Sequence, residues 1–235
     1  PVPRPYRCDL SNPIWQEVAG YTMPDFRPEW CNGSDEKIKR EFARYPDAAT
    51  FYRETQVYCY HGPVFFMEGI KRPYYAELFK DTANQDTTLL DYGCGAGDDG
   101  LMFASLGYNV SMADIRSLSL AFAAWRSLRR GHWLDFYNIG EGDIPRHHVV
   151  WCMDVLEHLP PLEQVILIGI LAGLGMNVYL NLVNDPNADG KLHYSVDIPS
   201  LTRLAETHWP TRHFDFYEGR VRLLIIDTSK GKISA

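Results

Sequence analysis

From residue 88 onward the chain alternates between short apolar runs and longer segments whose apolar residues recur at helical spacing. A short continuous apolar run predicts a buried strand, whereas an apolar residue at every third or fourth position predicts a helix. Strands separated by helices imply parallel crossover connections, so we expect a doubly wound α/β sheet. The predicted elements are, in order, a strand at 89–91, a helix at Asp98–Leu106, a strand at Asn109–Ala113, a helix at Leu118–Arg130, strands at His132–Ile139 and Val149–Met153, a helix at Leu162–Leu174 and a strand at Met176–Val183.

The C-terminal part of the chain does not continue the alternation of strand and helix. A helix is predicted at Ile198–Thr207, and two strands follow it at His213–Tyr217 and Val221–Asp227. Only residues 218–220 join these two strands, and so short a connection can make only an antiparallel hairpin. We therefore expect a mostly parallel sheet that ends in an antiparallel hairpin.

Residues 1–80 lack this alternation and contain many prolines and aromatic residues. Ser34 suits the N-cap of a helix, the Gly62–Pro63 pair predicts a break, and a further helix is expected at Pro73–Phe79. We expect residues 1–80 to form a helical cap on a core of residues 81–235. Five tyrosines are candidates for lining a pocket, although a single tyrosine more commonly packs a cap on its core: Tyr52, Tyr58, Tyr60, Tyr74 and Tyr75.

The stretch after the first predicted strand reads D-Y-G-C-G-A-G-D-D-G, from Asp91 to Gly100. Its glycines allow a sharp turn close to a ligand, and a helix that begins there directs its unpaired N–H groups at that ligand. Gly95, Gly97 and Gly100 satisfy G-x-G-x-x-G, the fingerprint of dinucleotide sites. Read from Asp91, the stretch resembles D-x-G-x-G-x-G, the first motif of class I S-adenosylmethionine-dependent methyltransferases. Spacing alone leaves both cofactors, and an ordinary strand–turn–helix, open.

Acidic residues around this turn favour a cationic cofactor. Asp91, Asp98 and Asp99 would repel a pyrophosphate, whereas they would attract the ammonium and sulfonium groups of S-adenosylmethionine. Asp114 ends the second predicted strand, 21 residues beyond Gly93. An acid in that place can accept hydrogen bonds from both hydroxyls of a cofactor ribose, and a dinucleotide would use it in the same way.

A second motif separates the two cofactors. The segment D-V-L-E-H-L-P, Asp154 to Pro160, follows the strand predicted at Val149–Met153. It resembles the D-V-L-E-H-L sequence of many small-molecule class I methyltransferases. The resemblance covers roughly residues 89–228, includes the C-terminal hairpin, and implies a mostly parallel seven-stranded core.

The resemblance also implies roles for single residues. The glycine turn would hold the methionine portion of S-adenosylmethionine, the end of the second strand would hold its ribose, and the second motif would lie beside the reacting methyl group. An acid after the third strand, Asp143 or Glu141, is expected near the adenine. The cofactor-binding residues that follow from this are Asp91, Gly93, Cys94, Gly95, Gly97, Asp114, Ile115, Asp143, Asp154 and Val155.

Methyl transfer from a sulfonium is an in-line displacement. The protein aligns the acceptor, excludes water and takes up a proton if the acceptor is a hydroxyl. His158 and His193, the second beside Tyr194 in the loop after the strand at Met176–Val183, are the candidate bases. Glu157 and His158 are also placed to line the acceptor pocket. A structural role is as common for either histidine, so both roles stay open.

Several other classes do not fit. Amino-directed nucleic-acid methyltransferases carry [DN]-P-P-[YF] where this chain has the second motif, and Cys152 lies within a predicted strand, unlike the nucleophile of cytosine-C5 enzymes. The net charge of −7 argues against nonspecific binding of nucleic acid. We therefore expect a small-molecule acceptor, methylated on oxygen, nitrogen or carbon, and no nucleic-acid partner.

Composition adds further expectations. Five cysteines without a C-x-x-C pair indicate neither a disulfide framework nor a zinc site, so we expect a reducing, cytoplasmic location. Glycines and asparagines interrupt the apolar run Val165–Val183, which favours a helix and a strand over a membrane span. The arginines of the 126–130 cluster are expected on the solvated end of a helix, and the pair His147–His148 in a solvated loop rather than at a metal.

The sequence as a whole predicts an S-adenosylmethionine-dependent methyltransferase with a helical cap over the acceptor site. One alternative is a nicotinamide-dependent oxidoreductase, which the G-x-G-x-x-G spacing would allow. Another is a catalytically silent relative that binds the cofactor or a protein partner.

Overall fold

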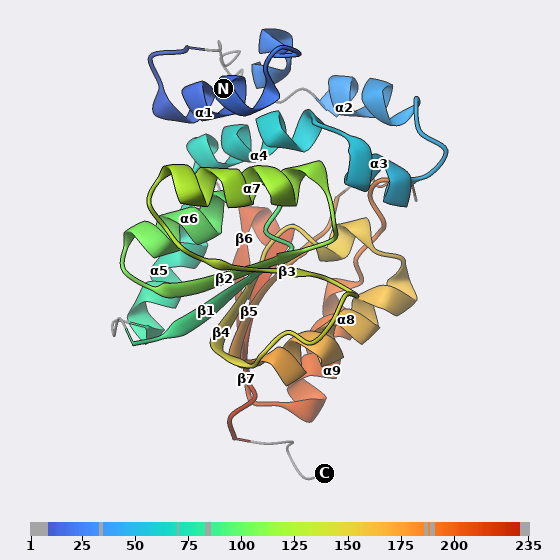
Figure 1. The fold of residues 1–235 in the computed structure, drawn as a ribbon. Coiled ribbons are helices and arrows are strands. Elements are labelled where there is room, and N and C mark those ends of the chain that lie inside the picture. The colour runs from blue at the N-terminus through green and yellow to red at the C-terminus, as the bar shows by residue number, and fades with distance from the viewer. Residues whose placement is uncertain are drawn as a thin grey trace.

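A computed structural model describes residues 9–32, 35–69, 71–82, 86–185, 188 and 191–230 (Figure 1). Helices and strands alternate from β1 to β3 and again from β4 to β5, as the apolar pattern predicts. The elements are α1 (Pro13–Thr22), η1 (Pro28–Asn32), α2 (Asp35–Phe42), α3 (Ala48–Glu54), α4 (Val57–Glu68), α5 (Arg72–Asp81), β1 (Thr88–Tyr92), α6 (Asp98–Ser105), β2 (Asn109–Asp114), α7 (Leu118–Arg129), β3 (Asp135–Asn138), β4 (His147–Cys152), η2 (Leu156–His158), α8 (Pro161–Leu174), β5 (Gly175–Val183), α9 (Ile198–His208), β6 (Thr211–Phe216), η3 (Tyr217–Gly219) and β7 (Val221–Asp227).

Seven strands form one sheet in the order β3-β2-β1-β4-β5-β7-β6. Strands β1 to β5 pair in parallel, whereas β7 is antiparallel to both β5 and β6. The last strand therefore turns back and inserts between β5 and β6. The prediction of a mostly parallel, doubly wound sheet that ends in an antiparallel hairpin is confirmed.

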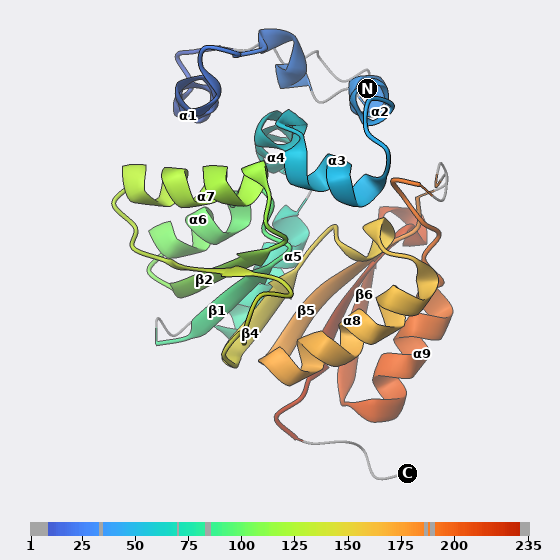
Figure 2. The ribbon, with the colours of Figure 1, turned by 45° about the vertical axis from the view of Figure 1, so that its right-hand side comes forward.

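Helices cover both faces of the sheet (Figure 2). The apolar residues of α8 and α9 pack on one face, and those of α5, α6 and α7 pack on the other. Helices α1 to α4 lie above one edge of this sandwich in both ribbon views. Trp15 and Val18 of α1 and Tyr60 of α4 share a buried cluster with Ala96, in the glycine turn, and Phe122 of α7. The N-terminal helices are thus packed directly on the turn between β1 and α6.

The predicted break at Gly62–Pro63 is wrong, because α4 runs through both residues. A proline normally excludes helical backbone at the preceding residue, since its Cδ collides with that residue's Cβ. Gly62 has no Cβ, so the helix continues. The expected N-cap of α2, Ser34, lies outside the described residues.

The prediction for His147 and His148 is also wrong. Both lie in β4 rather than in a loop, and His147 is buried. The ring of His147 hydrogen-bonds with the carbonyl of Pro145 and the hydroxyl of Ser111, whereas His148 contacts Thr88. Successive strand residues point to opposite faces, so the two rings make separate contacts, His147 with Ser111 of β2 and His148 with Thr88 of β1.

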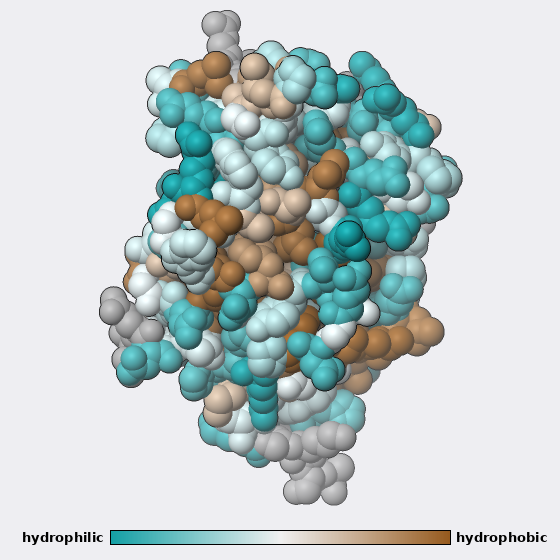
Figure 3. Space-filling model, in the orientation of Figure 1, coloured by the Kyte–Doolittle hydropathy of each residue, from teal (hydrophilic) through white to brown (hydrophobic). Residues whose placement is uncertain are grey.

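The apolar run Val165–Val183 divides into α8 and β5, as predicted. Among the described residues, the structure has no helix both long and apolar enough to cross a membrane. Leu162, Val165, Ile166 and Ile170 of α8 are nevertheless exposed. Figure 3 shows apolar surface along the right-hand edge, where α8 lies in Figure 1. Helix α8 is apolar on both sides, so its outer side remains apolar surface while its inner side is buried against the sheet.

The turn between β1 and α6 is closely packed against its neighbours. Gly97 caps α6 with a left-handed backbone, φ +76°. A Cβ on Gly97 would lie 2.8 Å from the Cβ of Ala123 and 3.1 Å from the sulfur of Met112. Gly131, after α7, has a similar φ of +79°, but nothing lies within 4 Å of its Cβ position. The two glycines therefore share a backbone conformation and differ in the space around them.

Replacing these two glycines with alanine should separate backbone strain from crowding. Gly131→Ala should cost about 1–2 kcal/mol, the penalty of left-handed backbone for a residue with a Cβ. Gly97→Ala should cost roughly a further 1–3 kcal/mol, because the methyl group overpacks the turn. Urea unfolding of both variants measures the difference, and equal losses of stability would contradict the packing described here.

Candidate functional site

The two sequence motifs meet at the point where the strand order reverses. Strands β1 and β4 are parallel neighbours, so the loops that follow them leave the same edge of the sheet. A Cβ on Gly93, in the first loop, would lie only 2.3 Å from Cγ2 of Val155, in the second. In open α/β sheets ligands bind in the crevice at such a reversal. The crevice between these two loops is therefore the candidate site.

The glycine turn is fastened to the end of β2. The N–H groups of Gly93 and Cys94 both donate to the carbonyl of Ala113. The carboxylate of Asp114 accepts from the N–H of Gly95 at 2.6 Å and from the N–H of Ile115 at 2.7 Å. Burial raises the pKa of Asp114 to about 6, against the opposing effect of these two hydrogen bonds. The structure thus brings together five residues of the predicted cofactor site: Gly93, Cys94, Gly95, Asp114 and Ile115.

Acidic side chains gather below the turn. Asp91 is 4% exposed, and its Oδ2 accepts from the N–H of Gly100 at 2.9 Å. Burial and the neighbouring Asp99 raise the pKa of Asp91 well above its ordinary value. Asp99 itself accepts hydrogen bonds from the hydroxyl of Tyr75 and the indole N–H of Trp151, each at 2.8 Å. A cation placed here would be strongly favoured.

Lys71 supplies a cation that the sequence did not reveal. Its Nζ lies 3.0 Å from Oδ2 of Asp99 and 3.2 Å from Oδ2 of Asp154. These two carboxylates outweigh the desolvation of the ammonium and raise the pKa of Lys71 well above its ordinary value. Lys71 precedes α5, in the segment without regular patterning, so no motif marks it. Only the packing of α5 beside β4 brings it to the site.

Asn181 of β5 holds Asp154 in an unusual backbone conformation, φ +58°. Oδ1 of Asn181 accepts from the N–H of Asp154 at 2.7 Å, and Nδ2 donates to Oδ1 of Asp154 at 2.6 Å. Burial opposes ionisation of Asp154, but Lys71 and Asn181 lower its pKa below the ordinary value. A buried asparagine inside an apolar strand was the available sequence signal for this contact.

The predicted histidines lie together beneath the N-terminal helices. Nδ1 of His158 lies 2.8 Å from the hydroxyl of Tyr52, in α3, and 3.0 Å from the carbonyl of Leu192. The rings of His158 and His193 have centroids 4.8 Å apart. Burial and the neighbouring His193 lower the pKa of His158 to about 4, so His158 is neutral near pH 7.

His193 has a carboxylate partner, unlike His158. Its Nδ1 lies 2.5 Å from Oδ2 of Asp185, and its side chain is 42% exposed. The backbone N–H of the predicted residue Tyr194 donates to the carbonyl of Glu157 at 2.6 Å. The loop that carries His193 is therefore tied to the second motif by its backbone.

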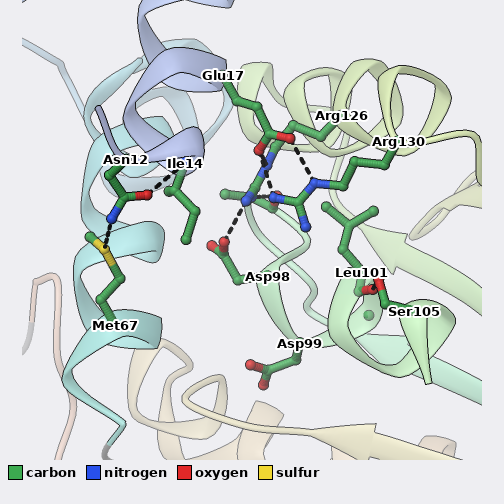
Figure 4. Close-up of polar contacts among 12 residues, drawn as sticks. Asn12, Ile14, Glu17, Met67, Asp98, Asp99, Leu101, Ser105, Arg126 and Arg130 are labelled. Atoms are coloured by element: carbon green, nitrogen blue, oxygen red, sulfur yellow. Dashed lines mark hydrogen bonds and ion pairs between the residues drawn. The ribbon is translucent and has the colours of Figure 1, made fainter. Parts of the chain in front are cut away.

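Asp98 and Arg126 differ from the sequence-based expectation (Figure 4). From the sequence, Asp98 is one of the acids expected to attract the cofactor's cationic groups, but it pairs with Arg126 at 2.7 Å. Arg126 was expected in solvent, yet its side chain is 1% exposed, and it also pairs with Glu17 of α1. A helix position alone does not show whether a distant segment will cover it.

The remaining predicted residues fall into two groups. Of the candidate pocket tyrosines, Tyr60 and Tyr74 are buried in packing clusters, and Tyr52 contacts His158. Asp143 is exposed in the loop after β3, whereas the nearby Glu141 accepts a hydrogen bond from the side chain of Asn138.

No family model matches the chain. The chain is similar over part of its length to proteins named ubiquinone biosynthesis O-methyltransferase. The one from Paraburkholderia xenovorans is 36% identical over 78 residues, which are 31% of this chain and 34% of that protein. The one from Pseudoalteromonas translucida is 30% identical over 105 residues, 42% of this chain and 44% of that protein. The chain thus spans less than half the length of these curated relatives.

Solved structures show the fold over more of the chain. Magnesium protoporphyrin IX methyltransferase from Synechocystis PCC 6803, with bound S-adenosylmethionine, has a TM-score of 0.55 at 19% identity and covers 81% of this chain and 90% of its own. An O-methyltransferase family protein from Burkholderia thailandensis has a TM-score of 0.57 at 14% identity, with 91% and 74% covered. The chain has the fold of class I S-adenosylmethionine-dependent methyltransferases.

One acid at the site should make stability depend on pH. Glu157 is 5% exposed, and burial and Asp154 raise its pKa from 4.5 to about 8. Between these two pH values the folded protein keeps a proton that the unfolded chain releases. The stability that this proton provides is complete below pH 4.5 and is lost as the pH rises through about 8.

Glu157→Gln should remove that loss. Relative to wild type, the free energy of unfolding of the variant should increase by a few kcal/mol between pH 5 and about pH 8.5, since one pKa unit corresponds to about 1.4 kcal/mol. Urea unfolding at three pH values measures this change. Glu163→Gln, at an exposed position of α8, is the matched control and should run parallel to wild type. Parallel curves for both variants would refute the raised pKa of Glu157.

Proposed function

We propose that this chain transfers a methyl group from S-adenosylmethionine to a hydroxyl group of a small molecule. The observation that carries the proposal is the gathering of Asp91, Asp114 and Asp154 around the glycine turn, at the reversal of strand order. This acidic crevice suits a cofactor with a sulfonium and an ammonium group and opposes a pyrophosphate. The fold and the partial similarity to enzymes named O-methyltransferases support the same conclusion.

The residues at the crevice fit the groups of the cofactor. Asp114 would accept hydrogen bonds from the ribose hydroxyls, and the N–H groups of the glycine turn would lie against the methionine portion. Lys71 would pair with the cofactor carboxylate, and Asp154 would lie near the sulfonium. Asp143 is our proposed adenine partner, because Glu141 is already bonded to Asn138. When bound, S-adenosylmethionine supplies a methyl group on a positively charged sulfur.

His193 is the proposed general base. Asp185 fixes the ring orientation by accepting from Nδ1, and that tautomer leaves the lone pair of Nε2 to take the proton of the acceptor hydroxyl. His193 would take up the proton that the hydroxyl releases as the acceptor oxygen gains the methyl group and the sulfur–methyl bond is lost. His158, with a pKa of about 4, is too weak a base for this step. We assign it a positioning role, with Tyr52 on one side and His193 on the other.

We also propose a division of labour between the N-terminal cap (residues 1–80) and the core (residues 81–235). The cap would recognise the acceptor, because Tyr52 of α3 reaches His158 from above. Helix α5, although nearly all of it lies within residues 1–80, packs on the sheet through Tyr74, Tyr75 and Leu78, so we assign recognition to the helices before it. A flat acceptor such as a phenol would suit the rings around the two histidines.

The first test is binding. Isothermal titration should show that the wild-type chain binds S-adenosylhomocysteine and not NAD. Asp114→Asn should weaken that binding roughly 10- to 100-fold, because hydrogen bonds to a charged group contribute about 1.5–3 kcal/mol. Asp135→Asn, at the start of β3, is the control and should bind normally. Binding of NAD alone would favour the oxidoreductase alternative.

The second test is turnover, followed by transfer of labelled methyl groups to a panel of phenols, alcohols and amines. His193→Gln should lower kcat by about 10²- to 10⁴-fold, the usual contribution of a general base. Asp185→Asn should lower kcat less, and neither change should alter the affinity for S-adenosylhomocysteine. His213→Gln removes a comparable histidine–carboxylate pair, His213–Glu206, outside the site and should leave kcat unchanged. Methylation of amines alone would overturn the hydroxyl assignment and leave the cofactor assignment standing.

A further inference from the structure

A buried arginine connects the N-terminal helix α1 to the glycine turn (Figure 4). The guanidinium of Arg126, on α7, uses all three of its nitrogens. Nε donates to Oε2 of Glu17 at 2.9 Å, Nη1 donates to the carbonyl of Ala96 at 2.7 Å, and Nη2 pairs with Oδ1 of Asp98 at 2.7 Å. Ala96 belongs to the turn proposed to hold the cofactor, and Asp98 begins the helix that follows. One planar group thus holds three segments at once.

Glu17 is the member of this network that comes from outside the core. It lies 109 residues before Arg126 in the chain and is 7% exposed. Its carboxylate also accepts two hydrogen bonds from Arg130, each at 2.6 Å. Breaking such a buried ion pair is costly, because it leaves either the carboxylate or an arginine as an unpaired buried charge. Docking of α1 and the position of Arg126 are therefore linked energetically.

The turn has little freedom on its outer side. Ala123, one helical turn before Arg126, lies under Gly97 so closely that a Cβ on Gly97 would be 2.8 Å away. On α4, a Cβ on Gly62 would lie 3.2 Å from the Cβ of Ala96. The turn is thus enclosed by α4 and α7, and Arg126 supplies the directional bond that fixes its carbonyl.

We propose that Glu17 is a positioning residue for cofactor binding: it holds Arg126 on Ala96 and Asp98, so that docking of α1 and occupation of the glycine turn stabilise each other. Without Glu17, the guanidinium loses the partner that fixes Nε and is left beside the like charge of Arg130, which pushes it out of position. The carbonyl of Ala96 then loses its charged donor, and the turn samples shapes that do not fit the cofactor. The proposal rests on the proposed function, since it assumes that the turn binds S-adenosylmethionine.

Coupling of this kind is reciprocal, because two events that stabilise the same arrangement must favour each other equally. Removing the carboxylate of Glu17 should weaken cofactor binding, and adding the cofactor should reduce the local opening of α1. A purely structural role for Glu17 predicts lower stability of the whole chain and no specific change at the turn.

The first experiment compares two α1 variants of the full chain by titration with S-adenosylhomocysteine. Glu17→Gln keeps the size of the side chain and removes its charge, and it should raise Kd roughly 5- to 50-fold, the range of typical coupling between linked sites. Val18→Ala, at a fully buried neighbour in α1, weakens the packing of the same helix without touching Arg126. It should leave Kd within about twofold of wild type, at a temperature where α1 stays docked in both variants, because Glu17 still holds Arg126 on the turn.

The second experiment uses the wild-type chain and needs no variant to fold. S-adenosylhomocysteine should slow amide hydrogen exchange in residues 14–22 of α1 more than in residues 198–208 of α9. Equal Kd changes for the two variants, or no added protection of α1, would overturn the proposal while leaving the proposed function intact. Failure of the wild-type chain to bind S-adenosylhomocysteine would overturn the proposed function, and this proposal with it.

Discussion

The concentration of carboxyl groups in one crevice is the constraint on which the rest of the site depends. Asp91 and Asp99 are both almost fully buried, and Asp154 lies beside them. Burying an ionised acid is costly unless hydrogen bonds and opposite charge compensate it. The surrounding structure supplies both, through the N–H of Gly100 and the ammonium of Lys71, together with Tyr75, Trp151 and Asn181. The compensating groups come from α5 and its N-cap residue, from α6, and from strands β4 and β5, so the site exists only when these elements are assembled.

The repeating part of the fold could be predicted from the sequence because its physical cause is local. Buried parallel strands produce short apolar runs, and helices that cover a sheet produce apolar residues at helical spacing. The hairpin could be predicted because the three residues between its strands permit no other connection. The cofactor crevice could be anticipated because Asp91, Asp114 and Asp154 each end or follow a predicted strand, and parallel strands end at one edge of the sheet.

Contacts between distant segments could not be predicted in this way. Lys71 and Asp99, or Glu17 and Arg126, carry no pattern that marks them as partners. An arginine at the end of an amphipathic helix is normally solvated, whereas Arg126 is buried among Glu17 of α1, Ala96 and Asp98. In the same manner, Pro63 predicts a break from local rules, whereas Gly62 and the surrounding packing let α4 continue.

The ion pair between Arg126 and Glu17 of α1 constrains how the sequences of related proteins can diverge. The α1 helix is far from the core in sequence, so its replacement by an unrelated segment would leave the strand pattern untouched. A replacement segment without a carboxylate at the position of Glu17 would, however, leave a positive charge unpaired beneath the turn. The residues at positions 17 and 126 should therefore vary together among related proteins. Relatives that lack the acid at 17 should also lack, or reorient, the cation at 126. Exchanging the N-terminal caps of two relatives should succeed only when both residues are exchanged.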